Sequence, residues 1–198
     1  MSTRQGRVVF LEDVLNRAVE QTKQIILEKN VTTENIDETA HDVGVGAVVF
    51  NELSNYRIKD YVFSWDKVLN FEGETGPYVQ YTHARACSIL RRAGEDTVKA
   101  AKKEFDTSWI TGESAHHLIK LLYALPEVIK EAGEKYEPSI VTRHIVDIAQ
   151  GFNKFYHDEH ILVEDEKEKT AKVALVLAVQ TAIKNGLGLL GMKAPEKM

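Results

Sequence analysis

The segment Phe71–Tyr81, FEGETGPYVQY, combines residue types that could bind a nucleotide. A short glycine-containing loop leads to Pro77, and proline suits the first position of a helix. Tyr78 and Tyr81 follow three residues apart, which places both rings on one helical face. A flexible loop that leads into a helix with aromatic rings could meet a phosphate or stack on a base. An ordinary loop-to-helix junction with two core tyrosines is the alternative interpretation.

A second candidate is Tyr156, which ends the apolar stripe Ile145, Ile148 and Phe152. The helix passes from the core into polar sequence at this point. A ring at such a boundary could stack on an unpaired base, which is worth about 1–3 kcal/mol. Alternatively, Tyr156 caps the core and keeps its hydroxyl in water.

The polar sequence after Tyr156 could also bind a metal ion. His157 and His160 are three residues apart and share a helical face, so with Asp158 or Glu159 they could bind zinc or iron. Structural metal sites need three or four ligands, and the adjacent His116 and His117 face different ways, so no second cluster is an obvious source of them. We predict no metal site, and a metal-binding helical bundle remains an alternative.

Charge is unevenly distributed along the chain. The net charge of −5 argues against a general nucleic-acid binder, because neutralised phosphates supply most non-specific affinity. Between Arg85 and Lys103, however, six basic residues stand against two acidic ones. This stripe, which includes Arg91 and Arg92, could dock one specific RNA, and a solvated helix face is the alternative.

Composition predicts a globular protein of one or two domains. The 198 residues are 43% hydrophobic and 28% charged, and no apolar run approaches the roughly 20 residues that cross a bilayer. A single cysteine, Cys87, cannot form an internal disulfide and should be a small buried residue, as expected in a reducing cytosol. We therefore expect a cytoplasmic protein without a membrane partner.

Hydrophobic periodicity indicates an all-α fold. We expect helices over Phe10–Lys29, Glu34–Phe50, Pro77–Gly94, Glu113–Tyr136 and Thr170–Leu187, with a further helix that starts at Pro138. We expect Tyr61–Trp65 to form a short extended segment. Pro126 should bend or split its helix, and Gly186, Gly188 and Gly191 should break the last helix into a tail.

Several continuous segments resemble the arginyl-tRNA synthetases, which are class I aminoacyl-tRNA synthetases. They are Phe71–Arg85 (FEGETGPYVQYTHAR), Asn55–Leu69 (NYRIKDYVFSWDKVL), the closing segment Gly186–Met198, and Met1–Gly6, which is similar to the family's KMSKS signature loop. The similarity covers essentially the whole chain, in the expected order. It concerns the C-terminal part of the family only.

The resemblance implies two regions and a function. Residues 76–198 would be an all-helical anticodon-binding domain. Residues 1–75 would be a mostly helical remnant of the catalytic domain, with a region that contacts the tRNA stem. The chain would be the C-terminal part of an arginine–tRNA ligase and would recognise tRNA(Arg), chiefly at the anticodon arm. The full enzyme would attach arginine to the tRNA 3′ end with ATP and magnesium.

The resemblance also implies that the catalytic set is incomplete. Met1, Ser2, Thr3 and Arg4 would be the rest of the KMSKS-like loop, whose leading lysine would stand immediately before Met1. The ATP-binding Rossmann core would belong to the missing N-terminal catalytic part of the same chain. We therefore expect no activity and no cofactor for this piece alone.

For tRNA binding, the resemblance singles out both ends of the anticodon-binding region. Tyr156 matches an anticodon-contacting aromatic residue, His160 stands where some members have an aromatic, and Met198 would lie near the anticodon loop. The full predicted set is Tyr156, Met198, His160, Asn153, Tyr78, Tyr81, Arg85, Arg91 and Arg92. Tyr78 and Tyr81 would transmit recognition into catalysis. A protein-interaction module derived from a synthetase is a further alternative.

Overall fold

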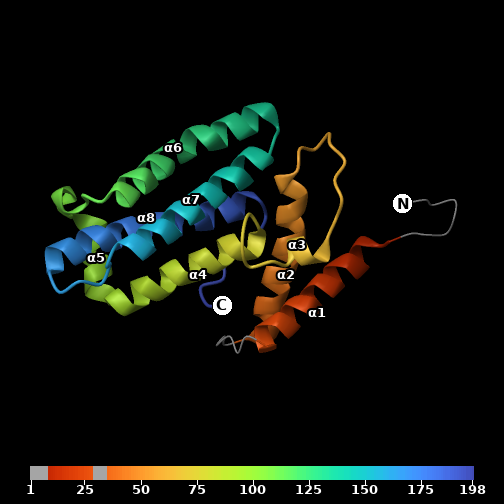
Figure 1. Ribbon diagram of the computed structural model, residues 1–198, viewed down its shortest axis with the longest axis horizontal. Helices are drawn as coiled ribbons and strands as arrows, with labels where there is room; N and C mark the ends of the chain where they lie inside the picture. The colour runs from red at the N-terminus through yellow and green to blue at the C-terminus, as the bar shows by residue number, and fades with distance from the viewer. Residues whose placement is uncertain (1–8, 29–34) are drawn as a thin grey trace.

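A computed structural model describes residues 9–28 and 35–198 of the chain, and within these ranges the regular structure is helical, with no strand. The helices form two groups (Figure 1). The first two helices pair with each other, and α4 to α8 form a bundle beside them. The predicted all-α class is therefore confirmed.

Helices α1 (Leu11–Glu28) and α2 (Ile36–Ser54) form the N-terminal pair. Asn35 caps α2, since its side chain accepts a hydrogen bond from the backbone N–H of Glu38 at 3.1 Å. The pair packs closely because Gly44 lies against the backbone of Ala18, where an added Cβ would come within 2.8 Å. The second helix runs four residues further than the sequence predicted.

An irregular connector joins this pair to the bundle. It contains one short helix, α3 (Trp65–Val68), and the expected extended segment Tyr61–Trp65 forms no strand. Phe63 packs edge-to-face on Trp65 with ring centroids 4.9 Å apart, and Arg17 of α1 lies 4.6 Å from the Trp65 ring. These contacts hold the connector against α1.

Helix α4 (Gly76–Ala93) begins as predicted, with Pro77 in its first turn. Thr75 caps it by accepting a hydrogen bond from the Tyr78 N–H at 3.2 Å. Gly94, with φ of 87°, then turns the chain into α5 (Glu95–Lys103), which we did not predict. Its acidic first turn and basic last turn favour a helix through the helix dipole and could have indicated it.

Three long helices follow the short 3₁₀ turn η2 (Thr107–Trp109). They are α6 (Glu113–Lys135), α7 (Ser139–Asp158) and α8 (Glu166–Leu189). Pro126 lies inside α6 and does not split it. The turns on both sides place Leu125 and Ala132 in the core, and this packing offsets the hydrogen bond that proline cannot make.

The sequence prediction also placed the end of the last helix too early, at Leu187 instead of Leu189. Gly186 and Gly188 lie inside α8, and only Gly191, with φ of 74°, lies beyond its end. Gly186 packs on α7, because an added Cβ would come within 2.5 Å of Ile145 Cγ2. This glycine therefore serves helix packing and does not break the helix.

The core lies where α8 crosses the bundle. Val176 and Ile183 of α8 and Phe152 of α7 are fully buried. Cys87 is buried and free, as predicted. Among the described residues, no helix is long and apolar enough to span a membrane.

Candidate nucleic-acid interface

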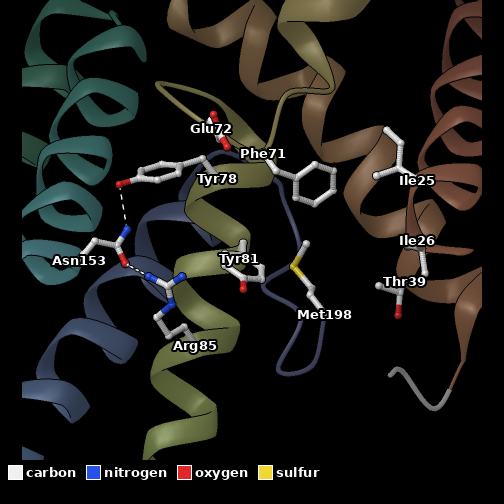
Figure 2. A pocket seen from close by; sticks show the side chains of 10 residues that line it. All are labelled: Ile25, Ile26, Thr39, Phe71, Glu72, Tyr78, Tyr81, Arg85, Asn153 and Met198. Carbon is white, nitrogen blue, oxygen red and sulfur yellow. Dashed lines mark hydrogen bonds between the residues drawn. The ribbon is translucent and has the colours of Figure 1, made fainter. Parts of the chain in front are cut away.

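A pocket of about 480 Å³ opens beside α4, at the boundary between the N-terminal helix pair and the bundle. Tyr78, Tyr81 and Arg85 of α4 line one side, because spacings of three and four residues place them on one helical face (Figure 2). Asn153 of α7 and Met198 complete this side of the pocket. Five of the nine predicted binding residues therefore meet in one place.

Asn153 holds the pocket together through hydrogen bonds. Its amide nitrogen donates to the Tyr78 hydroxyl at 2.8 Å and to Thr82 Oγ1 at 3.2 Å. Its amide oxygen accepts a hydrogen bond from the Arg85 guanidinium. Because these bonds occupy both ends of the amide, Asn153 fixes Tyr78 and Arg85 in place.

Arg85 lies between two aromatic rings. Its guanidinium carbon is 5.1 Å from the Tyr81 ring centre and 5.6 Å from that of Tyr156, within the range of cation–π attraction. The rings remain accessible, since Tyr81 is 40% exposed and Tyr156 is 41% exposed. Helices α4 and α7 thus present two rings and a cation on one surface.

The position of Tyr156 is compatible with both interpretations considered for it. Its ring stacks on Phe152, with centroids 6.4 Å apart and planes at 27°, and Phe152 is fully buried. One side of Tyr156 therefore covers the core while much of the ring reaches solvent. Such a ring is rigid and available for stacking.

The remaining predicted residues line two adjoining hollows. Arg92 and His160 lie with Tyr156 in one of about 360 Å³. Arg91 lies with Tyr81, Arg85 and Met198 in another of about 320 Å³. The described surface therefore brings all nine residues together along α4.

A buried ion-pair cluster supports the turn that carries His160. Lys172 is 7% exposed, and its ammonium lies 2.8 Å from both Glu159 and Glu168 and donates to the His160 carbonyl at 3.0 Å. Burial lowers the pKa of Lys172, but the bonds to Glu159 and Glu168 outweigh burial and hold this pKa above its ordinary value. The sequence signal that could have indicated this role is a lysine within an apolar helix.

Other lining residues could not be found from the sequence. Ile25 and Ile26 of α1 and Thr39 of α2 line the pocket of Tyr78 and Tyr81 from its far side. They reach it only because α1 and α2 pack beside α4, and no local pattern marks them. The pocket thus joins segments that are far apart in the chain (Figure 2).

The metal alternative finds no support in the geometry. His157 is strongly exposed and lies 3.2 Å from its neighbour Asp158. In residues 9–28 and 35–198, no group of three histidine, cysteine or acidic side chains is placed to hold an ion. The predicted catalytic remnant, Met1, Ser2, Thr3 and Arg4, lies outside the described residues.

Comparison with known families gives the class of domain that this fold and surface represent. Residues 79–198 match the model of the DALR anticodon binding domain. Residues 1–65 match the model of the class I tRNA synthetase (R) catalytic domain. The helical bundle with its aromatic and basic surface is thus an anticodon-binding domain by family.

Similar whole proteins agree with this class. The chain is 57% identical to the arginine–tRNA ligase of Halothermothrix orenii and 54% identical to that of Clostridioides difficile, over its full length and 34% of each relative. The arginyl-tRNA synthetase structure of Thermus thermophilus superposes with a TM-score of 0.88 at 33% identity, over 96% of this chain and 32% of that one. The Plasmodium falciparum structure shares the fold, with a TM-score of 0.83 at 24% identity, over 96% and 34% of the two chains.

The chain therefore belongs to the arginyl-tRNA synthetase family. It spans about a third of the length of the curated relatives that it matches. The predicted family is confirmed, and neither a metal-binding bundle nor a repurposed interaction module is favoured.

Proposed function

We propose that this chain recognises tRNA(Arg) through its anticodon arm, as the C-terminal part of an arginine–tRNA ligase. The whole protein would attach arginine to the 3′ end of the tRNA in the cytoplasm, with ATP and magnesium bound in its N-terminal catalytic part. Residues 76–198 would be the anticodon-binding domain, and residues 1–75 would belong to the catalytic domain and the tRNA stem contact.

The observation that carries this proposal is the placement of Arg85 between the half-exposed rings of Tyr81 and Tyr156. Proteins read single-stranded RNA by stacking unpaired bases on aromatic rings and guanidinium planes. An anticodon loop offers such bases. The three side chains offer stacking surfaces that the packing of α4 against α7 has already arranged.

The surrounding charges suit the RNA backbone next to those bases. Arg91 and Arg92 lie further along α4 and are exposed, so both could contact phosphates. Two acidic residues line these hollows: Glu159, which is paired with Lys172 at 2.8 Å, and Glu72, which lies in the pocket of Tyr78. The acidic net charge of the chain is therefore compatible with a locally basic docking surface.

Tyr78 lies where the proposed RNA-binding site meets the N-terminal helix pair. It shares the 480 Å³ pocket with Ile25 of α1 and Thr39 of α2, which lie in the region that matches the catalytic-domain model. A base bound beside Tyr78 would contact both the anticodon-binding region and the region of the catalytic domain. We propose that Tyr78 and Tyr81 transmit anticodon recognition towards catalysis.

Mapping of RNA contacts tests the proposal. The isotope-labelled chain is titrated with an anticodon stem-loop RNA of tRNA(Arg), and chemical shifts are followed by NMR. Signals of Tyr81, Arg85 and Tyr156 should move. Those of Tyr123, which is 87% exposed on α6, should stay. Shifts that centre on α6, or no shifts at all, would contradict an anticodon site on α4 and α7.

A further inference from the structure

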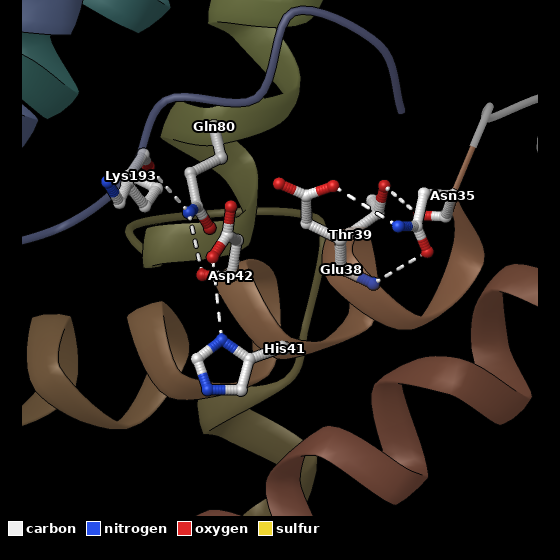
Figure 3. Close-up of polar contacts among 7 residues, drawn as sticks. All are labelled: Asn35, Glu38, Thr39, His41, Asp42, Gln80 and Lys193. Carbon is white, nitrogen blue, oxygen red and sulfur yellow. Dashed lines mark hydrogen bonds and ion pairs between the residues drawn. The ribbon is translucent and has the colours of Figure 1, made fainter.

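The C-terminal segment, residues 190–198, returns from the end of α8 and runs along α4 (Figure 1). Gln80 of α4 is fully buried, and its amide nitrogen donates to the Lys193 carbonyl at 2.9 Å. The same nitrogen donates to the Asp42 carbonyl of α2 at 3.1 Å (Figure 3). One side chain therefore ties the segment to two helices at once.

His83 makes the next contact, one turn further along α4. Its Nδ1 donates to the Pro195 carbonyl at 2.9 Å, and its Nε2 accepts a hydrogen bond from the Gln180 amide of α8 at 3.0 Å. This arrangement needs the neutral form of the ring with its proton on Nδ1. His83 is fully buried, and burial lowers its pKa, so the neutral form is favoured.

A third contact lies nearer the surface, where Arg91 donates to the Glu196 carbonyl at 3.1 Å. The carbonyls of Lys193, Pro195 and Glu196 are thus each bound by a side chain of α4. These contacts are made to the main chain of the segment. They fix its path whatever side chains it carries.

The two faces of α4 have different tasks. Gln80 and His83 are three residues apart and bind the C-terminal segment, while Tyr81 and Arg85 lie on another face and line the RNA-binding pocket. Met198 reaches this second face, where it shares hollows with Tyr81 and Arg85. The segment therefore passes from its anchoring face to the binding face within a few residues.

We propose that Gln80, His83 and Gln180 form a clamp that positions Met198 in the anticodon site. This inference rests on the proposed function and adds residues that do not touch RNA themselves. The clamp binds the Lys193 and Pro195 carbonyls, so the Met198 thioether occupies one place beside Tyr81 and Arg85. Gln80 further ties that place to α2.

The methyl signals of the methionines report on the clamp without any RNA. The chain has three methionines, Met1, Met192 and Met198, so a ¹³C-methyl-methionine spectrum is simple to assign. In His83→Phe and Gln80→Met, which keep the side-chain size but remove the donors, the Met198 signal should narrow and move to the position of a mobile methionine. An unchanged Met198 signal in folded variants would overturn the proposal.

His144 offers a matched control for His83. It is also a buried histidine, and its Nε2 bonds to a main-chain carbonyl, that of Leu121, at 2.9 Å, far from the C-terminal segment in sequence. His144→Phe should lower the melting temperature and leave the Met198 signal in place. A Met198 signal that moves equally in His83→Phe and His144→Phe would show a general loss of packing and would refute the clamp. If His83→Phe does not fold, Gln80→Met decides alone.

RNA affinity then tests whether the clamp acts through Met198. Met198→Ala should raise the dissociation constant for the anticodon stem-loop about two- to tenfold, the range of thioether–ring contacts. Gln80→Met should have a similar effect. The variant that carries both changes should bind the stem-loop as tightly as the single variant with the higher dissociation constant. Multiplied losses would contradict the clamp. Absence of RNA binding by the parent chain would instead refute the proposed function, while the methyl spectra still decide on the clamp.

Discussion

The side chain of Asn153 donates a 2.8 Å hydrogen bond to the hydroxyl of Tyr78, although 75 positions separate the two residues in the chain. This bond joins α7 to α4 at the edge of the pocket that Tyr81, Arg85 and Met198 also line. Because Asn153 also accepts a hydrogen bond from Arg85, it positions both an aromatic ring and a cation of the proposed RNA-binding site. Its removal should therefore affect stability and binding together.

We expect Asn153→Ala to lower the free energy of unfolding by about 1–2 kcal/mol, because two helices lose shared hydrogen bonds. Tyr78→Phe removes only the hydroxyl and should cost less. In a double-mutant cycle followed by urea denaturation, the two changes should couple by about 0.5–1.5 kcal/mol. Strictly additive losses would mean that the Asn153–Tyr78 bond does not contribute.

Tyr156→Ala should weaken stem-loop binding by about 1–3 kcal/mol, the usual value of one base stacked on an aromatic ring. Tyr156→Phe should bind nearly normally, since the ring remains. Affinity is measured by fluorescence anisotropy, and folding is checked by circular dichroism. A large loss of stability in Tyr156→Ala with unchanged affinity per folded molecule would indicate a core residue only.

Two glycines of α8 should respond in opposite directions to alanine. Gly186→Ala places a Cβ within 2.5 Å of Ile145 and should destabilise the chain by about 1–3 kcal/mol through overpacking. Gly188 has nothing within 4 Å of an added Cβ, so Gly188→Ala should stabilise α8 by about 0.5–1 kcal/mol. Thermal denaturation of both variants tests the register of α8 against α7, and a stabilising Gly186→Ala would contradict it.

Stability should fall as the solution is acidified below the ordinary pKa of histidine, about 6.5. Burial lowers the pKa of His83, and the positive charge of Lys184 lowers this pKa further. The hydrogen bond to Pro195 and the negative charge of Glu196 act in the opposite direction, but burial outweighs them. The unfolded chain therefore takes up a proton at a pH where the native chain does not, so the native state loses stability as the pH falls. His83→Phe should show a shallower pH dependence of the melting temperature between about pH 7.5 and 5.5. If the melting temperatures of His83→Phe and of the parent chain depend on pH in the same way, His83 is not the source of the acid sensitivity.

Much of this architecture could be predicted from the sequence because it depends on local signals. Pro77 and the Tyr78–Tyr81 spacing indicated both the start of α4 and the face that lines the pocket. The apolar stripe that ends at Tyr156 indicated α7 and its boundary with solvent. The family followed from long continuous segments, which carry more information than spaced motifs.

Other features depend on packing between distant segments and could not be predicted in this way. Pro126 stays within one helix because the turns around it are buried on both sides. In the sequence, Gly186 indicates the end of a helix, whereas in the folded chain it lets α8 pack closely against Ile145. The hydrogen bonds of Gln80 and His83 to the C-terminal segment span 113 and 112 positions. Only the folded chain shows why these polar residues are buried.

The most direct test of anticodon recognition compares two stem-loop RNAs that differ only at the middle anticodon base. Their dissociation constants for this chain are measured at several salt concentrations, since phosphate contacts weaken with salt and base contacts persist. We predict that the tRNA(Arg) stem-loop binds about tenfold more tightly than the altered RNA at every salt concentration, as expected when the hydrogen bonds to the edge of one base are lost. Equal dissociation constants for the two RNAs at all salt concentrations would contradict recognition of the anticodon by this chain.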